Sequence, residues 1–220
     1  MDAPFAFSHG KARREYGATK RLSRAQLLAD PLEQFLSWLQ EAEEKGEVEP
    51  NAFALATATR QAVPSVRFVL MKHIDKEGLL FFTNYGSRKG RELADNPLAA
   101  ATFFWPLCER QVRLEGSVVR CTRAMSDHYF AIRPRAAQLA CWASQQSRPV
   151  GCREELEAAY ADYELLYGEQ PVPLPPEWGG YRLLFSKVEL WQGGSHRLHD
   201  RFLYSSTGPC GEWTIERLAP

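Results

Sequence analysis

The 220-residue sequence has no apolar run approaching the roughly 18 residues of a membrane span. Its first residues show neither the apolar stretch of a secretory signal nor a clear transit-peptide pattern. We therefore expect a folded, cytoplasmic protein with no membrane partner. An excess of charge is also lacking, because 27 basic residues balance 27 acidic ones. No global field draws such a chain to nucleic acid, so any anion site must be local.

Cysteine is scarce and irregularly spaced. The five cysteines are odd in number and form no Cys-x-x-Cys pair, which favours reduced thiols over disulfides or a zinc site. The sequence has no glycine-rich phosphate loop, no His-Glu-x-x-His motif and no serine nucleophile elbow. His196 and His199 are three residues apart with no carboxylate set beside them, so we expect no bound metal. These absences argue against metal catalysis and against a serine nucleophile.

Apolar residues make up 45% of the chain and aromatic residues 12%, which is enough for a large core. Short runs rich in Val, Phe, Leu and Thr, separated by turn residues, indicate a mainly β fold. They predict strands over 53–59, 65–73, 79–83, 99–105, 111–119, 181–190 and 213–217. The pattern is typical of a β-barrel with flanking helices.

Helical segments are predicted between these strands, over 87–95, 124–133 and 154–167. An earlier helix is predicted from its end signals, with Asp30 as N-cap, Pro31 in the first turn and Gly46 as the stop. The basic segment before it shows no sustained periodicity. We therefore expect a mobile arm over residues 1–26, followed by a single domain over residues 27–220.

The segment Gly86-Ser87-Arg88-Lys89-Gly90 predicts an anion site at a helix start. Ser87 is a good N-cap, yet Arg88 and Lys89 place two cations where the helix dipole favours negative charge. Free amides, the dipole and two cations together suit a phosphate. The alternative is a pair of exposed cations, which costs only about a few tenths of a kcal/mol.

A second cluster lies in the predicted helix 124–133. Tyr129 and Arg133 are four residues apart, so they present a phenol and a guanidinium on one helical face. This pair either binds a second phosphate or is an ordinary surface pair.

The third cluster is Arg197-Leu198-His199-Asp200-Arg201. If these residues form a strand, Arg197, His199 and Arg201 share one face as a row of donors for an anion. The alternative is a solvated strand edge, where cations discourage pairing with other strands. The first two clusters are local anion sites, and the sequence has no nucleophile or metal motif beside them. This combination is typical of a protein that holds a phosphorylated cofactor.

Seven segments in order resemble the pyridoxine/pyridoxamine 5′-phosphate oxidase family, from about Arg13 to Pro220. They are RFVLMK at 67–72, FFTNYGSRKG at 81–90, ERQV at 109–112, Tyr129-Phe130 with RPR at 133–135, WGGY at 178–181, WQG at 191–193 with RLHDR at 197–201, and ERLAP at 216–220. The resemblance implies an FMN-binding split β-barrel that works as a homodimer with FMN at the subunit interface.

The resemblance also assigns site residues. It implies FMN contacts from Arg67, Phe68, Val69, Leu70, Met71, Lys72, Phe82, Thr83, Arg88, Lys89, Gln111, Gln146, Ser147, Trp191 and Arg201. It implies substrate contacts from Lys72, Tyr129, Arg133, Ala137, Arg197 and His199, with Arg13 and Tyr16 on the arm as a lid. Arg197 and His199 are expected to be the catalytic residues that orient the substrate ring.

The implied activity is that of a pyridoxal 5′-phosphate synthase. Pyridoxamine 5′-phosphate or pyridoxine 5′-phosphate would lose a hydride from C4′ to the flavin, and dioxygen would reoxidise the flavin to give hydrogen peroxide. Two alternatives stay open: a protein that binds FMN or pyridoxal 5′-phosphate without turnover, and a split-barrel flavoenzyme for another aromatic substrate.

One position departs from the family pattern. The family has a serine whose hydroxyl contacts the substrate phosphate, and this chain has Ala137 there. Loss of a hydrogen bond to a charged group costs on the order of 1.5 to 3 kcal/mol, so we predict weaker substrate binding. Ala140 and Cys141 also stand where the family usually has Gly and Ala.

Overall fold

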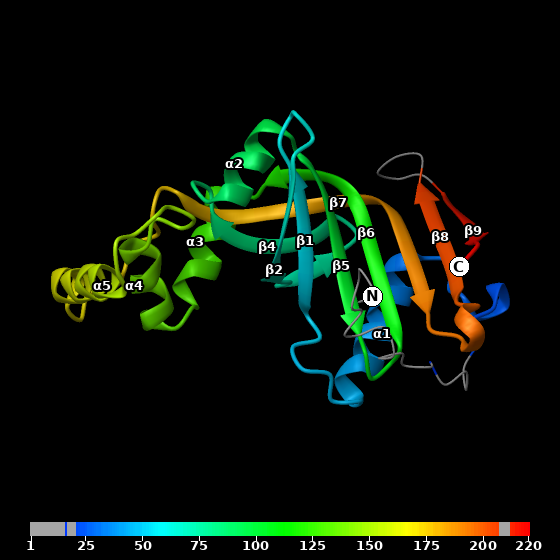
Figure 1. The fold of residues 1–220 in the computed structure, drawn as a ribbon. Coiled ribbons are helices and arrows are strands. Elements are labelled where there is room, and N and C mark those ends of the chain that lie inside the picture. Colours follow the sequence, from blue (N-terminus) through cyan, green and yellow to red (C-terminus); the bar gives the residue numbers. More distant parts are fainter. Residues whose placement is uncertain (1–15, 17–20, 207–211) are drawn as a thin grey trace, which may run out of the picture.

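A computed structural model describes residues 16, 21–206 and 212–220, and its centre is a curled sheet of nine antiparallel strands (Figure 1). The strands are β1 (Ala52–Ala58), β2 (Pro64–Leu70), β3 (His73–Asp75), β4 (Gly78–Asn84), β5 (Leu98–Trp105), β6 (Arg110–Arg120), β7 (Trp178–Gln192), β8 (Asp200–Ser206) and β9 (Trp213–Leu218). Their order is β2-β1-β5-β6-β7-β4-β3, and β8 pairs with both β7 and β9. The mainly β class is confirmed, and a strand lies at each predicted position.

Five helices flank the sheet in the described part of the chain. They are α1 (Pro31–Glu44), α2 (Arg88–Asp95), α3 (Arg123–Ala131), α4 (Arg135–Ala143) and α5 (Arg153–Tyr167). The signals for α1 are confirmed, because Asp30 Oδ1 accepts a hydrogen bond from Leu32 N at 2.8 Å and Gly46 has a φ of 77° after the helix. None of the described helices has the length and apolar character to cross a membrane.

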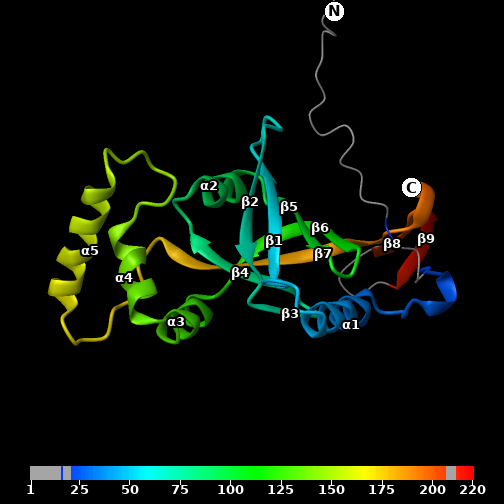
Figure 2. The same ribbon diagram turned by 60° about the horizontal axis from the view of Figure 1, so that its bottom comes forward.

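The long strand β7 runs through the middle of the sheet and connects its two ends. It pairs with β6 from Tyr181 to its end, with β4 over its first part and with β8 over its second part. Figures 1 and 2 show α3, α4 and α5 at one end of β7 and β8 and β9 at the other. At about 3.3 Å per residue, Trp178 and Trp191 are roughly 40 Å apart along the strand.

The main core lies between the sheet and α1. The fully buried side chains Phe53, Leu55, Phe81 and Leu183 belong to it, and Phe35 of α1 packs against the sheet there. The chain that enters α1 is also held in place, because Leu22 is buried and its N–H donates to Asp200 Oδ2 at 2.9 Å.

A second, smaller core joins the helical end to the sheet. It contains Phe130 of α3, Leu139 of α4 and Trp178 at the start of β7. This core places α3 and α4 opposite β2 and β4.

Candidate functional site

A cavity of about 1010 Å³ opens between β2, β4, the start of α2 and the α3–α4 segment. Its lining includes the predicted FMN residues Arg67, Phe68, Val69, Leu70, Lys72, Phe82, Thr83, Arg88, Lys89, Gln146 and Ser147 and the predicted substrate residues Tyr129, Arg133 and Ala137. We call these residues the cavity set. The described lining has five cationic side chains and no acidic one, which suits an anionic ligand.

The start of α2 brings a buried ammonium into this cavity. Ser87 Oγ accepts a hydrogen bond from Gly90 N at 3.2 Å, which confirms the predicted N-cap. Lys89 is only 8% exposed and donates to Thr83 Oγ1 and Gln146 Oε1, each at 2.9 Å. Burial, and then the charge of Arg67, lower the pKa of Lys89 to about 8. The described oxygens around this cation are neutral, so its charge is available to an anion.

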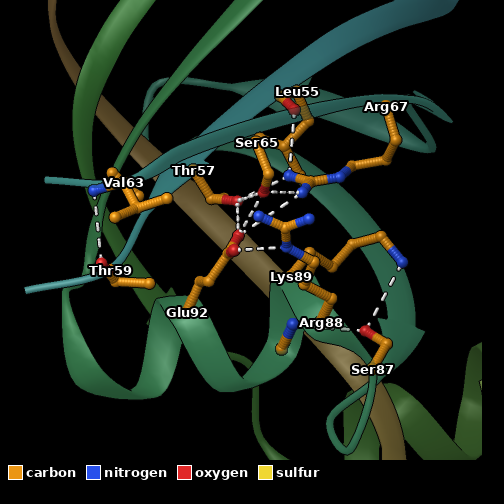
Figure 3. A network of polar contacts seen from close by, with 12 residues as sticks. Leu55, Thr57, Thr59, Val63, Ser65, Arg67, Ser87, Arg88, Lys89 and Glu92 are labelled. Atoms are coloured by element: carbon orange, nitrogen blue, oxygen red, sulfur yellow. Dashed lines mark hydrogen bonds and ion pairs between the residues drawn. The ribbon is translucent and has the colours of Figure 1, made fainter. Parts of the chain in front are cut away.

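A buried carboxylate organises the two arginines beside Lys89 (Figure 3). Arg88 Nε lies 2.9 Å from Glu92 Oε1, and Arg67 Nη2 lies 3.4 Å from Oε2. Burial raises the pKa of Glu92, but hydrogen bonds from Ser65, Thr57 and Arg88 and the charge of Arg67 outweigh it and lower the pKa to about 2. Sequence reasoning missed Glu92, although its position four residues after Arg88 on a predicted helix signals such a pair.

The charges around this group do not balance within the chain. Three cations, Arg67, Arg88 and Lys89, face the single carboxylate of Glu92, which leaves two positive charges. A phosphate monoester carries about −1.5 to −2 charges at neutral pH. The group therefore matches one phosphate.

The opposite wall of the cavity carries the second cationic group. The prediction that Tyr129 and Arg133 share a helix is wrong, because α3 ends at Ala131. A residue before proline is disfavoured in the α conformation, which stops the helix. Both side chains still line the cavity: Tyr129 is stacked parallel to Trp178, and the Arg133 guanidinium lies 4.8 Å from the centre of a Trp178 ring. Trp178 lies in the WGGY segment, but no spacing in the sequence indicates its contact with Arg133.

At the other end of β7, three predicted FMN residues form a row across the sheet. Gln111 of β6 lies opposite Trp191 of β7, and Trp191 lies opposite Arg201 of β8. Directly opposed residues share one face of a sheet. The adjacent residues Val112 and Leu190 are fully buried in the core, so the row lies on the outer face.

The strand predicted over residues 197–201 is wrong at its beginning. The residues Ser195–Arg197 form a 3₁₀ turn, and β8 begins only at Asp200. His196 and Arg197 have positive φ values of 57° and 62°, which a strand does not contain. Arg197 therefore projects from a tight turn and does not share a strand face with Arg201.

The turn places His199 beside two aromatic rings. Its ring centre is 4.7 Å from that of Trp191 and 5.7 Å from that of Tyr16. Nδ1 of His199 accepts a hydrogen bond from Gly194 N at 3.1 Å, so a neutral His199 carries its proton on Nε2. Tyr16 thus contacts a predicted catalytic residue, whereas the predicted substrate residue Arg13 lies outside the described residues.

The predicted site residues fall into two groups at opposite ends of β7. The residues Tyr16, Gln111, Trp191, Arg197, His199 and Arg201, which we call the row set, do not line the cavity. The predicted FMN residue Met71 is buried in the core. One chain does not bring the cavity set and the row set together.

Known families match both parts of the chain. Residues 39–167 match the pyridoxamine 5′-phosphate oxidase family, and residues 178–220 match the pyridoxine 5′-phosphate oxidase C-terminal dimerisation region. A pyridoxine/pyridoxamine 5′-phosphate oxidase of Salinibacter ruber is 49% identical over 209 residues, which cover 94% of this chain and 97% of the relative. A protein of the same name from Rubrobacter xylanophilus is 51% identical over 191 residues, 87% of each chain.

Solved structures share the fold. PhzG from Burkholderia lata, crystallised with tetrahydrophenazine-1-carboxylic acid, has a TM-score of 0.85 and 32% identity, with 93% of this chain and 100% of that chain covered. A pyridoxamine 5′-phosphate oxidase-related, FMN-binding protein from Nostoc punctiforme has a TM-score of 0.69 at 16% identity, covering 88% of this chain and 100% of that one. The second likeness concerns the fold alone.

Proposed function

The chain belongs to the pyridoxamine 5′-phosphate oxidase family, and from this premise we propose that it binds FMN and oxidises pyridoxamine 5′-phosphate and pyridoxine 5′-phosphate to pyridoxal 5′-phosphate. The observation that carries the proposal is a single cavity with two separate cationic groups, one around Lys89 and one around Arg133. A phosphorylated cofactor and a phosphorylated substrate bound together need two such groups.

The group around Lys89 fits the phosphate of FMN. Arg67, Arg88 and Lys89 keep two positive charges after Glu92 is counted, and Lys89 has only neutral oxygens beside it among the described residues. Bound FMN would supply the redox chemistry, in which C4′ of the substrate would lose a hydride, its alcohol or amine group would lose a proton, and dioxygen would be reduced to hydrogen peroxide. The alcohol would give the aldehyde directly, whereas the amine would give an imine that water converts to the aldehyde and ammonia. The protein's part is to hold the two molecules in register, which can supply about 7 to 11 kcal/mol of the barrier.

The group around Arg133 fits the substrate phosphate. Arg133 and Tyr129 share the wall beside Trp178, and Lys72 lines the same cavity. In the row set, Arg197 and His199 orient the substrate ring, and the Nε2 proton of a neutral His199 is available to a substrate oxygen or nitrogen. Tyr16 packs edge-on against His199 and Trp191 and helps to cover the ring.

The site is completed by a second copy of the chain. The interface of a two-fold dimer is self-complementary, so the row set of each protomer can meet the cavity set of its partner and form two equivalent sites. Two observations support this arrangement. Apart from Tyr16 and Gln111, the row set lies within the segment that matches the dimerisation region. The apolar side chain of Phe68 at the cavity is 78% exposed in one chain, as expected of a surface that a second chain covers.

Another aromatic substrate is the second candidate. Ala137 lacks the hydroxyl that the family has on the wall that we assign to the substrate phosphate, and PhzG holds tetrahydrophenazine-1-carboxylic acid in the same fold. The phosphate-binding pair Tyr129 and Arg133 favours the first candidate. A third candidate, binding without turnover, predicts the same contacts and differs only in its kinetics.

Anaerobic flavin reduction tests these candidates. Pyridoxamine 5′-phosphate should bleach the visible absorbance of the yellow holoenzyme, and air should restore it with equal yields of pyridoxal 5′-phosphate and peroxide. Arg197→Met should slow the bleaching by about 100-fold with FMN still bound, because orientation of the ring is lost. Arg88→Ala is the matched control, since it should lower FMN occupancy more than the rate at saturation. A flavin that stays oxidised with both B6 phosphates would overturn the proposal.

A further inference from the structure

Arg133 is held by a thiol from the next helix. Its Nη1 donates to Cys141 Sγ at 2.8 Å, and both residues line the cavity. Cys141 Sγ also lies 3.3 Å from Ala137 O and donates its proton there. The S–H bond therefore points along α4, and the sulfur lone pairs face the guanidinium.

The thiol stands one helical turn from the position of the missing hydroxyl. Residues 137 and 141 of α4 are four apart, so they lie on the same helical face, about 6 Å apart along the axis. Ala137 has no polar side-chain atom, whereas Cys141 presents one to the same wall of the cavity. We propose that Cys141 is a positioning residue that orients Arg133 toward the substrate phosphate and compensates for Ala137. This inference rests on the proposed function, in which Arg133 binds that phosphate.

A neutral partner suits this role better than a carboxylate. Within the part of the chain that the structure describes, Cys141 Sγ accepts the only hydrogen bond that the Arg133 side chain donates, and the cavity lining contains no acidic residue. The rings of Trp178 and Phe130, whose centres lie 4.8 Å and 5.7 Å from its Cζ, restrict the plane of the guanidinium but leave its charge unpaired. Sulfur therefore fixes the direction of the group and leaves the full positive charge for the ligand.

Binding and kinetics of a Cys141→Ala variant test this role. In the holoenzyme we expect the Kd for pyridoxal 5′-phosphate, measured by calorimetry, to rise by about five-fold, the effect of one modest hydrogen bond. KM for pyridoxamine 5′-phosphate should rise equally, with kcat at saturation unchanged. Cys141→Ser should restore both constants, because a hydroxyl can donate to the same carbonyl and accept from Arg133. Cys121→Ala, at a half-buried thiol outside the cavity, is the control and should change neither.

Double substitutions separate positioning from packing. Once Arg133→Ala is present, adding Cys141→Ala should have no further effect on Kd, because the two residues act as one unit. Ala137→Ser should improve binding by less than about two-fold in the wild type but restore it in the Cys141→Ala background. The inference is overturned if Cys141→Ala leaves Kd unchanged, or weakens binding equally with and without Arg133. A wild-type holoenzyme that binds no pyridoxal 5′-phosphate would instead refute the proposed function.

Discussion

The cavity set and the row set hold their charges in different ways. In the cavity set, Arg67 and Arg88 are tied to Glu92, which is 5% exposed, and hydroxyl groups surround the carboxylate. In the row set, Arg201 pairs with Glu189 at 2.8 Å, while Arg197 is exposed on a turn. The first group is assembled by folding of one chain, whereas the second lies on an outer surface and, in the dimer that we propose, acts at the cavity of the partner.

Backbone strain marks both groups. Ser147 in the cavity set has a φ of 68°, and His196 and Arg197 have φ values of 57° and 62°. Such conformations cost on the order of 1 kcal/mol each for residues other than glycine, and they concentrate at functional sites. The turn leaves the Arg197 side chain exposed, which is consistent with the contact that we propose with a second subunit.

Mixed dimers give the largest expected effect. We expect Lys89→Met to abolish FMN retention in the cavity of its own chain, and Arg197→Met to disable orientation of the substrate in the cavity of the partner chain. In a dimer with one chain of each kind, both substitutions then fall in the same site. If each site takes one group from each subunit, a dimer that contains one chain of each kind has one intact site. Such dimers, purified through two different tags, should recover about half of the wild-type activity, as measured by peroxide release.

The control for this experiment is a mixture of the two separately purified variants, assayed before the chains exchange. That mixture should keep only the residual activities of its components. Tagged mixed dimers that are no more active than this mixture would show that each site is built within one chain.

Substitution of Glu92 should have the next largest effect. It measures how much the buried carboxylate of Glu92 stabilises the fold around the cavity set. Glu92→Ala leaves Arg67 and Arg88 without a counter-charge, so we expect the free energy of unfolding to fall by about 3 kcal/mol in urea titrations of the apoprotein. Inorganic phosphate should then stabilise the variant more than the wild type. Glu157→Ala, in the exposed pair with Arg153, should cost less than about 0.5 kcal/mol. Equal losses in the two variants would contradict the assigned role.

The pH dependence of FMN binding is the smallest expected effect, and it distinguishes the contribution of Lys89 from that of the row set. Burial and the Arg67 charge lower the pKa of Lys89 to about 8 in the free protein. Near pH 7 the Lys89 side chain is mostly protonated before and after binding, and at pH 8 it is about half protonated in the free protein, so affinity should fall by no more than about two-fold between these values. Above pH 8 Lys89 is mostly neutral in the free protein, so it must take up a proton to pair with the phosphate of FMN. The affinity for FMN should therefore fall by up to about ten-fold per pH unit. Fluorescence titrations of FMN between pH 7 and 9.5 measure this slope.

Lys89→Met is the matched variant for the pH series. It should bind FMN weakly at every pH and lose the slope above pH 8, whereas Arg201→Met should keep the slope. A slope that persists in Lys89→Met would assign the proton to another group.

The sequence predicted the fold well where local signals decide it. Alternating strands and turn residues located β1, β5 and β6, and Ser87 was correctly predicted to cap α2. The predictions were wrong where the backbone leaves a regular helix or strand. Pro134 ended α3 before Arg133, and the positive φ of Arg197 replaced the predicted strand by a turn.

The candidate site could be predicted only in part. Family resemblance named residues that the structure gathers in the cavity, such as Arg67, Lys89 and Tyr129. It did not indicate which of them one chain brings together, because spacing in sequence does not show that β7 separates its ends. Glu92 and Cys141 were missed as partners, since their contacts with Arg67 and Arg133 depend on packing between different elements.

The length of β7 sets the distance between the cavity set and the row set. Trp178 lies at the cavity and Trp191 belongs to the row set, so in the proposed dimer the spacing of the two sites changes in steps of about 3.3 Å per residue of β7. Near the middle of β7, the register with β6 shifts at Gly116. Glycine permits this close approach of the two strands, because a Cβ at Gly116 would overlap the Leu184 carbonyl. Insertion of one residue between Trp178 and Trp191 would turn Trp191 toward the core and disable both sites at once.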